Sequence, residues 1–333
     1  MYVIMPTSWD EHPFLKNKFC LTSQSQIDKI IGYGLTEVLV DPENSTAQGR
    51  RVIAETGPVS GPPVETQRDA ASGAEERIAT RKAPEKEIPT LPTDKLREAI
   101  QDRKLPAPEK SRIVRDNAMT MMDGLLSEPT AKNIRTARTA IAEIVELILT
   151  DDATAAYLTK ITDHDYYTYT HSVNVGFLAV SMAKILFRNS HAHDMHELGI
   201  GFFLHDLGKV QIDPAIINKP GRLTADEMNV MRKHPSLGYR LLYEAHQLTD
   251  ECKTIVLQHH ERHDGTGYPK ALRGDQIHLY GRICSLADVF DALTSDRPYR
   301  KKMAPFEALI LMKNEMINHF QKDLYEKFVV MLA

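Results

Sequence analysis

The stretch LGIGFFLHDLGK at residues 198–209 decides how this 333-residue chain folds. It opens with an apolar run, as expected of a buried helix, and then places His205 and Asp206 side by side before Gly208 and Lys209. An imidazole and a carboxylate beside Phe and Leu side chains are costly to bury unless they are paired or bind a metal ion. The segment therefore predicts a core helix that ends at a polar site.

The same combination of an apolar segment and a polar group recurs along the chain. Of the 14 histidines, 13 fall between His164 and His319. The groups that interrupt or end apolar segments are His171 beside VNVGFLAVSMAKIL (173–186), His234 before Pro235, His259 and His260 in TIVLQHHE (254–261), and Asp288 and Asp291 in RICSLADVFDALTS (282–295). A lone histidine on an apolar helix is more often a hydrogen-bonded core residue. Five histidines and two aspartates in this arrangement favour a metal site instead.

Adjacent ligand candidates bear on how many metal ions such a site holds. Consecutive helical residues point about 100° apart, so neither His205 and Asp206 nor His259 and His260 chelate one ion together. Each pair can instead give one ligand to each of two nearby ions, or place one carboxylate between them. Imidazole and carboxylate ligands without a thiolate suit Fe, Mn, Zn, Co or Ni.

Composition excludes several classes of protein. With a net charge of -4, 42% hydrophobic and 26% charged residues, the chain is neither wholly disordered nor a collagen-like or coiled-coil rod. It has no apolar run of about 18 residues, which a membrane helix needs, and no secretory signal. Three scattered cysteines form neither a disulfide framework nor a CxxC site. We expect a cytoplasmic protein with no membrane segment and no DNA or RNA partner.

The chain divides into three zones. Residues 1–40 read as a small α+β module, with a short helix at 23–34, a strand in TEVLV (36–40) and a first strand cut short at MYVIM. Residues 41–110 hold nine of the 18 prolines and few large apolar residues, so we expect a long flexible linker with a short helix near 94–104. Residues 111–333 read as the helical catalytic domain, whose last helix we expect to be truncated.

The helical zone has a mainly α pattern without strand signals. Ile134, Ile141, Ile144 and Ile148 recur at helical spacing and predict an amphipathic helix over 131–149. Further helices are expected at 166–188, 195–205, 224–232, 235–246, 249–261, 281–294 and 305–319. The prediction is a mainly α-helical bundle.

Five ordered motifs carry a family resemblance. THSVNVGFLA (170–179), HDLGK (205–209), KHPSLGY (233–239), HHERHDGTGYP (259–269) and ADVFDALTSDRPYR (287–300) resemble the HD-GYP phosphodiesterases of bacterial cyclic-dinucleotide signalling. The resemblance covers roughly residues 130–333. The first zone more weakly resembles a small domain of unknown function found ahead of some HD-GYP domains.

The resemblance implies an HD-superfamily helical bundle with a two- or three-metal centre, typically of iron or manganese. It assigns the metal ligands to His171, His205, Asp206, His234, His259, His260 and Asp288, with Asp206 bridging. Members with three metals carry a Glu where this chain has Tyr167. A tyrosine, with a pKa near 10, is a poor replacement ligand, so we predict two divalent ions, Fe or Mn, and attack by a bridging hydroxide.

Other residues receive roles around this centre. Lys209 acts with Asp206 in catalysis, by binding phosphate and protonating the leaving oxygen. Arg297 and Arg300 suit phosphate binding, because a guanidinium can bind phosphate with two hydrogen bonds. Asp291 orients a ligand histidine, and Glu261 supports the histidine pair before it. The loop of Asp264, Gly265, Gly267, Tyr268 and Pro269 shapes the mouth of the site or docks a partner, and Tyr268 is a candidate for stacking on a guanine.

The leading hypothesis is a cyclic di-GMP phosphodiesterase that releases pGpG, GMP or both. The alternatives are a 3′,3′-cyclic GMP-AMP phosphodiesterase, a general HD phosphohydrolase, and a non-enzymatic module that binds cyclic di-GMP or docks a protein. The GYP loop and RPYR tail argue against the second of these, and the intact ligands with Lys209 argue against the third. A diguanylate cyclase and a second copy of the chain are the candidate protein partners.

Overall fold

The computed structural model describes residues 2–4, 18–20, 39–41, 91, 93–160, 168–296 and 301–332. The chain forms two compact units, Met1–Thr90 and Leu91–Ala333. In the first, the described strands β1 (Tyr2–Ile4), β2 (Lys18–Cys20) and β3 (Leu39–Asp41) form an antiparallel sheet in the order β2-β1-β3. The predicted helix at 23–34 lies outside the described residues.

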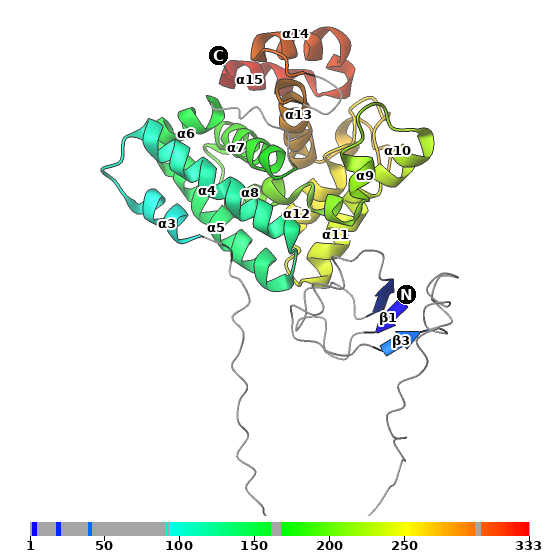
Figure 1. The fold of residues 1–333 in the computed structure, drawn as a ribbon. Helices are drawn as coiled ribbons and strands as arrows, with labels where there is room; N and C mark the ends of the chain where they lie inside the picture. The colour runs from blue at the N-terminus through cyan, green and yellow to red at the C-terminus, as the bar shows by residue number, and fades with distance from the viewer. Residues whose placement is uncertain are drawn as a thin grey trace, which may run out of the picture. The chain divides into compact units, whose positions relative to one another are not determined.

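The second unit is helical, which confirms the predicted fold class (Figure 1). Its helices lie close to the predicted ranges, and α4, α6, α9 and α15 are additions to them. The elements are α3 (Asp94–Gln101), α4 (Ala107–Ser127), α5 (Ala131–Thr150), α6 (Asp152–Lys160), α7 (Thr168–Phe187), α8 (Met195–Leu204), η1 (Leu207–Gln211), α9 (Pro214–Ile217), α10 (Ala225–Met231), α11 (His234–Glu244), α12 (Asp250–Gln258), η2 (Gly274–Gln276), α13 (Leu279–Thr294), α14 (Pro305–Glu315), η3 (Ile317–His319) and α15 (Lys322–Leu332).

The helical unit begins earlier than residue 111, where the sequence pattern places its start. Helix α3 packs on α4 and α5, and Leu96 and Ala99 are buried there. The few apolar residues of this segment are spaced along one face of a helix, so their burial is enough to join it to the bundle. Residues 42–90 of the predicted linker lie outside the described part of the chain.

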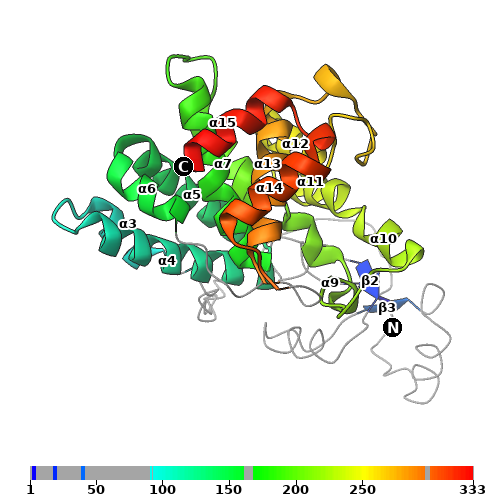
Figure 2. The same cartoon turned by 90° about the horizontal axis from the view of Figure 1, so that it is seen from above.

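Helix α7 is the centre of the bundle and contacts α4, α5, α6, α8 and α13 (Figures 1 and 2). Among the described residues it is the one helix long and apolar enough to cross a membrane, but 78% of its most apolar window is buried inside the unit. A helix that is apolar on all sides is expected in such a core position. Its burial explains the composition of this segment without a membrane.

Gly208 and Gly238 let the segment after α8 approach α11 closely. A Cβ atom on Gly208, in η1, would lie 2.0 Å from the carbonyl oxygen of His234 and 2.4 Å from the amide nitrogen of Gly238. Neither contact is sterically possible, so only a glycine fits at position 208. The close approach brings Asp206, just before η1, next to His234 at the start of α11.

Candidate metal centre

Helix ends place most of the predicted ligands. His205 follows α8, His259 and His260 follow α12, and His234 opens α11. His171 lies in the first turn of α7, and Asp288 lies within α13. Apolar helix bodies anchor these ends in the core, so the side chains are buried or, for His260, partly buried. The structure brings all seven predicted ligands together.

The ligand atoms form two groups that share one carboxylate. In one group are His234, His259, His260 and Asp206, and in the other are His171, His205 and Asp288; within each, the ligand atoms lie within 4.8 Å of one another. The expectation that adjacent His259 and His260 serve different ions is therefore wrong, because both follow the last residue of α12, where the side-chain directions of a helix no longer apply. Oδ1 of Asp206 is 3.2 Å from His234 Nε2. Its Oδ2 is 3.4 Å from His205 Nε2 and 3.5 Å from His171 Nε2. The Asp206 carboxylate therefore lies between the two groups.

Main-chain carbonyl groups orient three of the rings. The Nδ1 atoms of His205, His234 and His259 lie 2.7, 2.8 and 2.9 Å from the carbonyl oxygens of Phe202, Met231 and Val256. A carbonyl oxygen only accepts hydrogen bonds, so each Nδ1 carries the proton and donates. Each Nε2 then presents a lone pair to the cluster. Metal-ligating histidines are held in this way by a hydrogen bond from the other ring nitrogen.

Polar atoms without partners test whether the cluster fits metal ions. His205 Nε2 and Asp206 Oδ1 are buried, and neither has a hydrogen-bond partner among the described residues. Buried polar atoms are rarely left in this state, because the cost is about 1–3 kcal/mol each. Neither ligand group contains a cysteine. These two ligand atoms without partners, together with a ligand set of nitrogen and oxygen atoms, fit hard or borderline divalent cations.

The protonation states also suit metal binding. Burial lowers the pKa of His234 to about 3 and that of His260 to about 4, against the opposing charges of Asp206 and Asp288. Burial lowers the pKa of His259 as well, helped by His260. Metal ligands must be neutral imidazoles, so at neutral pH these rings are already in the binding form.

The two carboxylates stay ionised despite their burial. Burial opposes ionisation of Asp206, but the Lys209 ammonium and then His205 hold its pKa well below the ordinary value. Burial likewise opposes ionisation of Asp288, and contacts with His171 and His260 hold its pKa well below the ordinary value. The cluster therefore combines neutral nitrogen ligands with anionic oxygen ligands.

Lys209 lies against the shared carboxylate. Its Nζ donates a hydrogen bond to Asp206 Oδ2 over 2.5 Å. Lys209 lies in η1, three residues after Asp206. The side chain is only 12% exposed, so the ammonium is held at the edge of the cluster rather than in solvent. It can reach a group bound at the two ligand groups.

Asp291 contacts His171, as its three-residue spacing from Asp288 suggests. Its Oδ2 accepts a hydrogen bond from His171 Nδ1 over 2.7 Å, and its Oδ1 accepts one from the Asn174 amide over 2.7 Å. Asn174 in turn accepts from Arg115. Sequence reasoning missed these two residues; the available signal was a polar residue in the apolar stretch after His171.

Glu261 has a different placement from the one expected of a supporting carboxylate. It is buried, and its two oxygens accept hydrogen bonds from the main-chain amides of Lys270 and Leu272, at 2.7 and 2.8 Å. It therefore closes the loop that follows the ligand pair.

The same loop brings Tyr268 over a ligand. The Tyr268 ring lies 4.6 Å from the His260 ring, with an angle of 31° between the planes, and the Arg232 guanidinium lies 5.6 Å from its centre. Burial raises the pKa of Tyr268, so the phenol is neutral. The turn before it is held by Asp264, which accepts from Thr266, and by Gly267, whose Cβ would lie 2.4 Å from the Arg262 amide nitrogen. Gly265 has φ +82, and Pro269 completes the loop.

Three predicted positions are not placed by the structure. Arg297 and Arg300, expected to bind phosphate, lie outside the described residues. Tyr167, which stands at the position of a possible third-metal ligand, also lies outside them.

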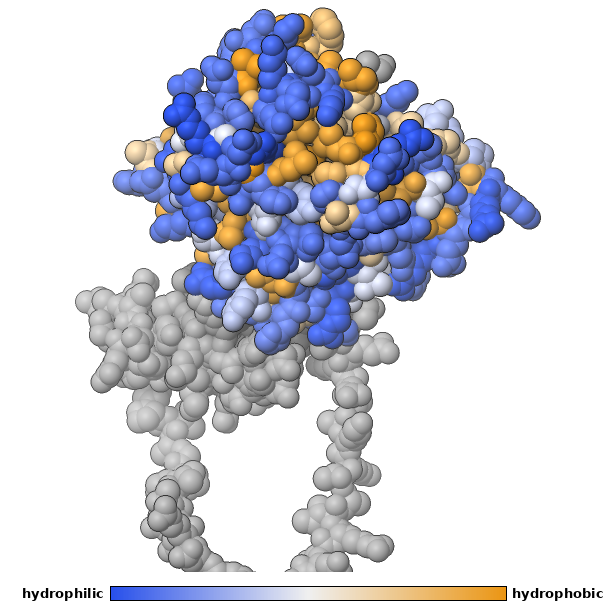
Figure 3. Space-filling model, turned by 180° about the vertical axis from the view of Figure 1, so that it is seen from behind, coloured by the Kyte–Doolittle hydropathy of each residue, from blue (hydrophilic) through white to orange (hydrophobic). Residues whose placement is uncertain are grey.

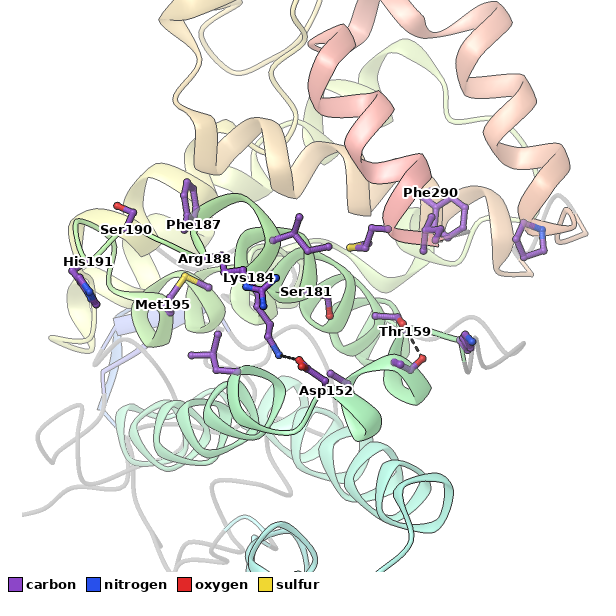
Figure 4. Close-up of a pocket in the computed structure, with 18 residues that line it drawn as sticks. Asp152, Thr159, Ser181, Lys184, Phe187, Arg188, Ser190, His191, Met195 and Phe290 are labelled. Carbon is purple, nitrogen blue, oxygen red and sulfur yellow. Dashed lines mark hydrogen bonds and ion pairs between the residues drawn. The ribbon is translucent and has the colours of Figure 1, made fainter.

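A separate cavity of about 860 Å³ lies between α7 and the C-terminal helices. None of the predicted site residues lines it. Figure 3 shows apolar side chains gathered in a hollow below the C-terminal helices. In the close-up, Lys184 reaches to Asp152, while Ser181, Phe187 and Phe290 line other parts of the wall (Figure 4).

The chain is similar to proteins of known families. An HD domain family model matches residues 160–324, and a model for a domain of unknown function, DUF3391, matches residues 1–150. A cyclic di-GMP phosphodiesterase of Pseudomonas aeruginosa is 31% identical over 331 residues, which cover 97% of this chain and 71% of the relative. A 3′3′-cGAMP-specific phosphodiesterase of Vibrio cholerae is 40% identical over 124 residues, which are 37% of this chain and 24% of the relative.

The fold also has a solved neighbour. A structure described as an HDG"Y"P protein from Bdellovibrio bacteriovorus matches with a TM-score of 0.61 at 18% identity. The match covers 72% of this chain and 76% of that one. At this identity the likeness supports the fold.

Proposed function

The chain belongs to the HD-GYP family of cyclic-dinucleotide phosphodiesterases, and we propose that it hydrolyses cyclic di-GMP to pGpG, GMP or both at a site for two divalent cations. The observation that carries the proposal is the Asp206 carboxylate, with one oxygen 3.2 Å from His234 Nε2 and the other 3.4 Å from His205 Nε2. One carboxylate between two sets of imidazole ligands is suited to two adjacent cations. The P. aeruginosa relative supports the choice of cyclic di-GMP.

Each ligand group would hold one cation. His234, His259 and His260 serve one, and His171, His205 and Asp288 serve the other, with Asp206 shared. When bound, two such cations would supply Lewis acidity at the phosphate oxygens and would lower the pKa of a water molecule, so that hydroxide is available as the nucleophile. The nitrogen and oxygen ligands suit Fe, Mn, Zn, Co or Ni, and among these we propose Fe or Mn, which the family resemblance favours.

Lys209 acts on the substrate beside these ligands. Its ammonium already lies 2.5 Å from the shared carboxylate, so a phosphate bound at the cations comes within its reach. There it neutralises negative charge that develops in the transition state, and its Nζ holds a proton for the leaving oxygen. Arg297 and Arg300, which lie outside the described residues, keep their predicted role of binding substrate phosphate.

Tyr268 borders the substrate site. Its position over His260 and beside Arg232 makes the loop a wall of the mouth, where a guanine meets an aromatic face. Glu261 keeps this wall in place by fixing the end of the loop. A diguanylate cyclase partner, a homodimer and a cytoplasmic location remain predictions from the sequence.

A second candidate substrate is 3′,3′-cyclic GMP-AMP. The V. cholerae relative named for this substrate is 40% identical over 124 residues. The two substrates differ in one base, so the cations and Lys209 would act on both alike.

The test is anaerobic turnover by full-length protein loaded with Fe(II) or Mn(II), with cyclic di-GMP and 3′,3′-cyclic GMP-AMP assayed in parallel. Chromatography identifies the products, and metal analysis counts the ions per chain. We expect cleavage of cyclic di-GMP that is lost in His205→Ala and kept in His196→Ala, whose exposed ring contacts Glu146 outside the cluster. Two bound metals per chain without cleavage of either substrate would leave a binding or docking module instead.

A further inference from the structure

A buried chain of hydrogen bonds connects helix α4 to the metal centre. Arg115 Nη1 donates to Asn174 Oδ1 over 2.7 Å, and Asn174 Nδ2 donates to Asp291 Oδ1 over 2.7 Å. His171 Nδ1 then donates to Asp291 Oδ2 over 2.7 Å. All four side chains are almost completely buried, so water does not compete for these contacts.

The arginine determines which way the Asn174 amide faces. With its oxygen toward the guanidinium and its nitrogen toward the carboxylate, the amide makes two favourable contacts. If the amide were flipped, its NH₂ group would face the N–H donors of Arg115 and its oxygen would face the Asp291 oxygen. Both contacts would then be repulsive, because a guanidinium only donates and a carboxylate only accepts. Arg115 therefore holds a donor against Asp291.

Asp291 passes this constraint to the ligand. Its Oδ1 accepts from Asn174 and, at 3.2 Å, from Ser295 Oγ, which leaves Oδ2 for His171. A carboxylate at Nδ1 keeps the proton on that nitrogen and directs Nε2 away from it. His171 Nε2 then lies 3.0 Å from Asp288 and 3.5 Å from Asp206.

Arg115 is itself firmly anchored. A second guanidinium nitrogen, Nη2, donates to the Leu158 carbonyl oxygen over 2.6 Å, and the group lies 5.4 Å from the centre of the Phe177 ring. Its helix, α4, lies outside the residues 160–324 that match the HD domain and within the residues 1–150 that match the domain of unknown function.

We infer that Arg115 is a positioning residue of the metal centre, and that α4 completes the site from outside the HD domain match. The inference rests on the proposed metal centre and deepens it. Arg115 on α4 is thereby connected to the ligand His171 through Asn174 and Asp291. A displacement of α4 would therefore alter metal binding.

The experiment measures Mn²⁺ affinity of the full-length chain by calorimetry, so it does not depend on turnover. Arg115→Met should weaken the site by up to about 10-fold, the low end of the effect of losing a group bonded directly to a ligand, because Arg115 acts through Asn174 and Asp291. Arg138→Met is the control. Arg138 is a part-buried arginine on α5, and it pairs with Glu197 and the Gln247 carbonyl oxygen rather than with the chain that leads to His171. It should lose thermal stability and keep its Mn²⁺ affinity.

Two further variants separate positioning from folding. Asn174→Asp keeps the shape of the side chain but places an acceptor against Asp291, so it should also weaken Mn²⁺ binding. Arg115→Lys retains the positive charge but has a single nitrogen in place of the two that contact Asn174 and Leu158, so it should recover part of the affinity. The double variant Arg115→Met with Asn174→Asp should deviate from the sum of the two effects, because the two side chains are in direct contact.

Unchanged Mn²⁺ affinity in folded Arg115→Met and Asn174→Asp would overturn the inference, as would an equal loss in Arg138→Met. These outcomes are distinct from failure of the proposed function. In that case the wild-type chain would bind Mn²⁺ and leave both cyclic dinucleotides intact.

Discussion

The Nε2 atoms of His234 and His259 lie 3.1 Å apart in the buried cluster, although each ring already donates its Nδ1–H to a main-chain carbonyl oxygen. Two lone pairs then face each other without a proton between them. A cation bound by these nitrogens and the Asp206 carboxylate would convert the repulsion into coordination. The arrangement therefore favours metal binding.

Divalent metal should therefore stabilise the protein strongly. At a Mn²⁺ concentration 100 times its dissociation constant, the free energy of unfolding should rise by about 2.7 kcal/mol. Scanning calorimetry with and without Mn²⁺ measures the change, and a chelator should reverse it. In His259→Ala the increase should shrink, whereas in His196→Ala it should be retained. An equal increase in both variants would point to binding elsewhere.

The metal-free protein should be acid-labile well above the pKa of its carboxylates. Burial lowers the pKa of His234 to about 3 and of His260 to about 4, so between these values and 6.5 the unfolded state binds protons that the folded state does not. Stability is then present above pH 6.5 and is lost as the pH falls, by up to about 1.4 kcal/mol per pH unit for each histidine. Urea unfolding of metal-free protein from pH 7.5 to 5 measures the slope. A flat profile would show that the rings are not buried as neutral groups.

Lys209→Met should affect turnover and leave the metal count intact. The ammonium lies at the edge of the cluster and is not a ligand, so two ions should still bind per chain. Loss of a positioned proton donor typically lowers kcat by about 10²–10⁴-fold. Lys219→Met is a suitable control, since Lys219 pairs with Glu227 away from the cluster. A large loss of bound metal in Lys209→Met would instead assign the lysine to holding Asp206.

Gly208→Ala should disrupt the centre through the backbone. Its Cβ would meet the His234 carbonyl at 2.0 Å, so η1 and α11 must separate. Overpacking of this kind costs about 1–3 kcal/mol of stability, and the separation should also weaken metal binding. At Gly124 the nearest obstacle is the end of the Leu91 side chain at 2.9 Å, which can move, so Gly124→Ala should be milder in both measurements. Thermal unfolding and Mn²⁺ titration of the two variants provide the comparison, and equal metal affinity would contradict the role of the close approach.

Local patterns were sufficient for most of the helices, and they singled out the polar side chains that meet in the cluster. The spacing of Ile134, Ile141 and Ile144 predicts α5, and its buried face contains all three. Costly polar groups at the ends of apolar segments pointed to His205, His259 and their neighbours, which the structure brings together. The mainly α fold class is confirmed. A helix near α3 was predicted, but its membership of the helical domain was not, because a short helix with two buried residues differs little in composition from a linker.

The sequence by itself determined most of the helical segments and the side chains that are available as ligands, because both depend on residue type and spacing within one segment. Only the tertiary structure decided that the two oxygens of Asp206 face different groups, that Glu261 closes the loop, and that Arg115 reaches Asp291 through Asn174. These contacts join residues from helices far apart in the chain. Their geometry depends on how the helices pack, which no local spacing encodes.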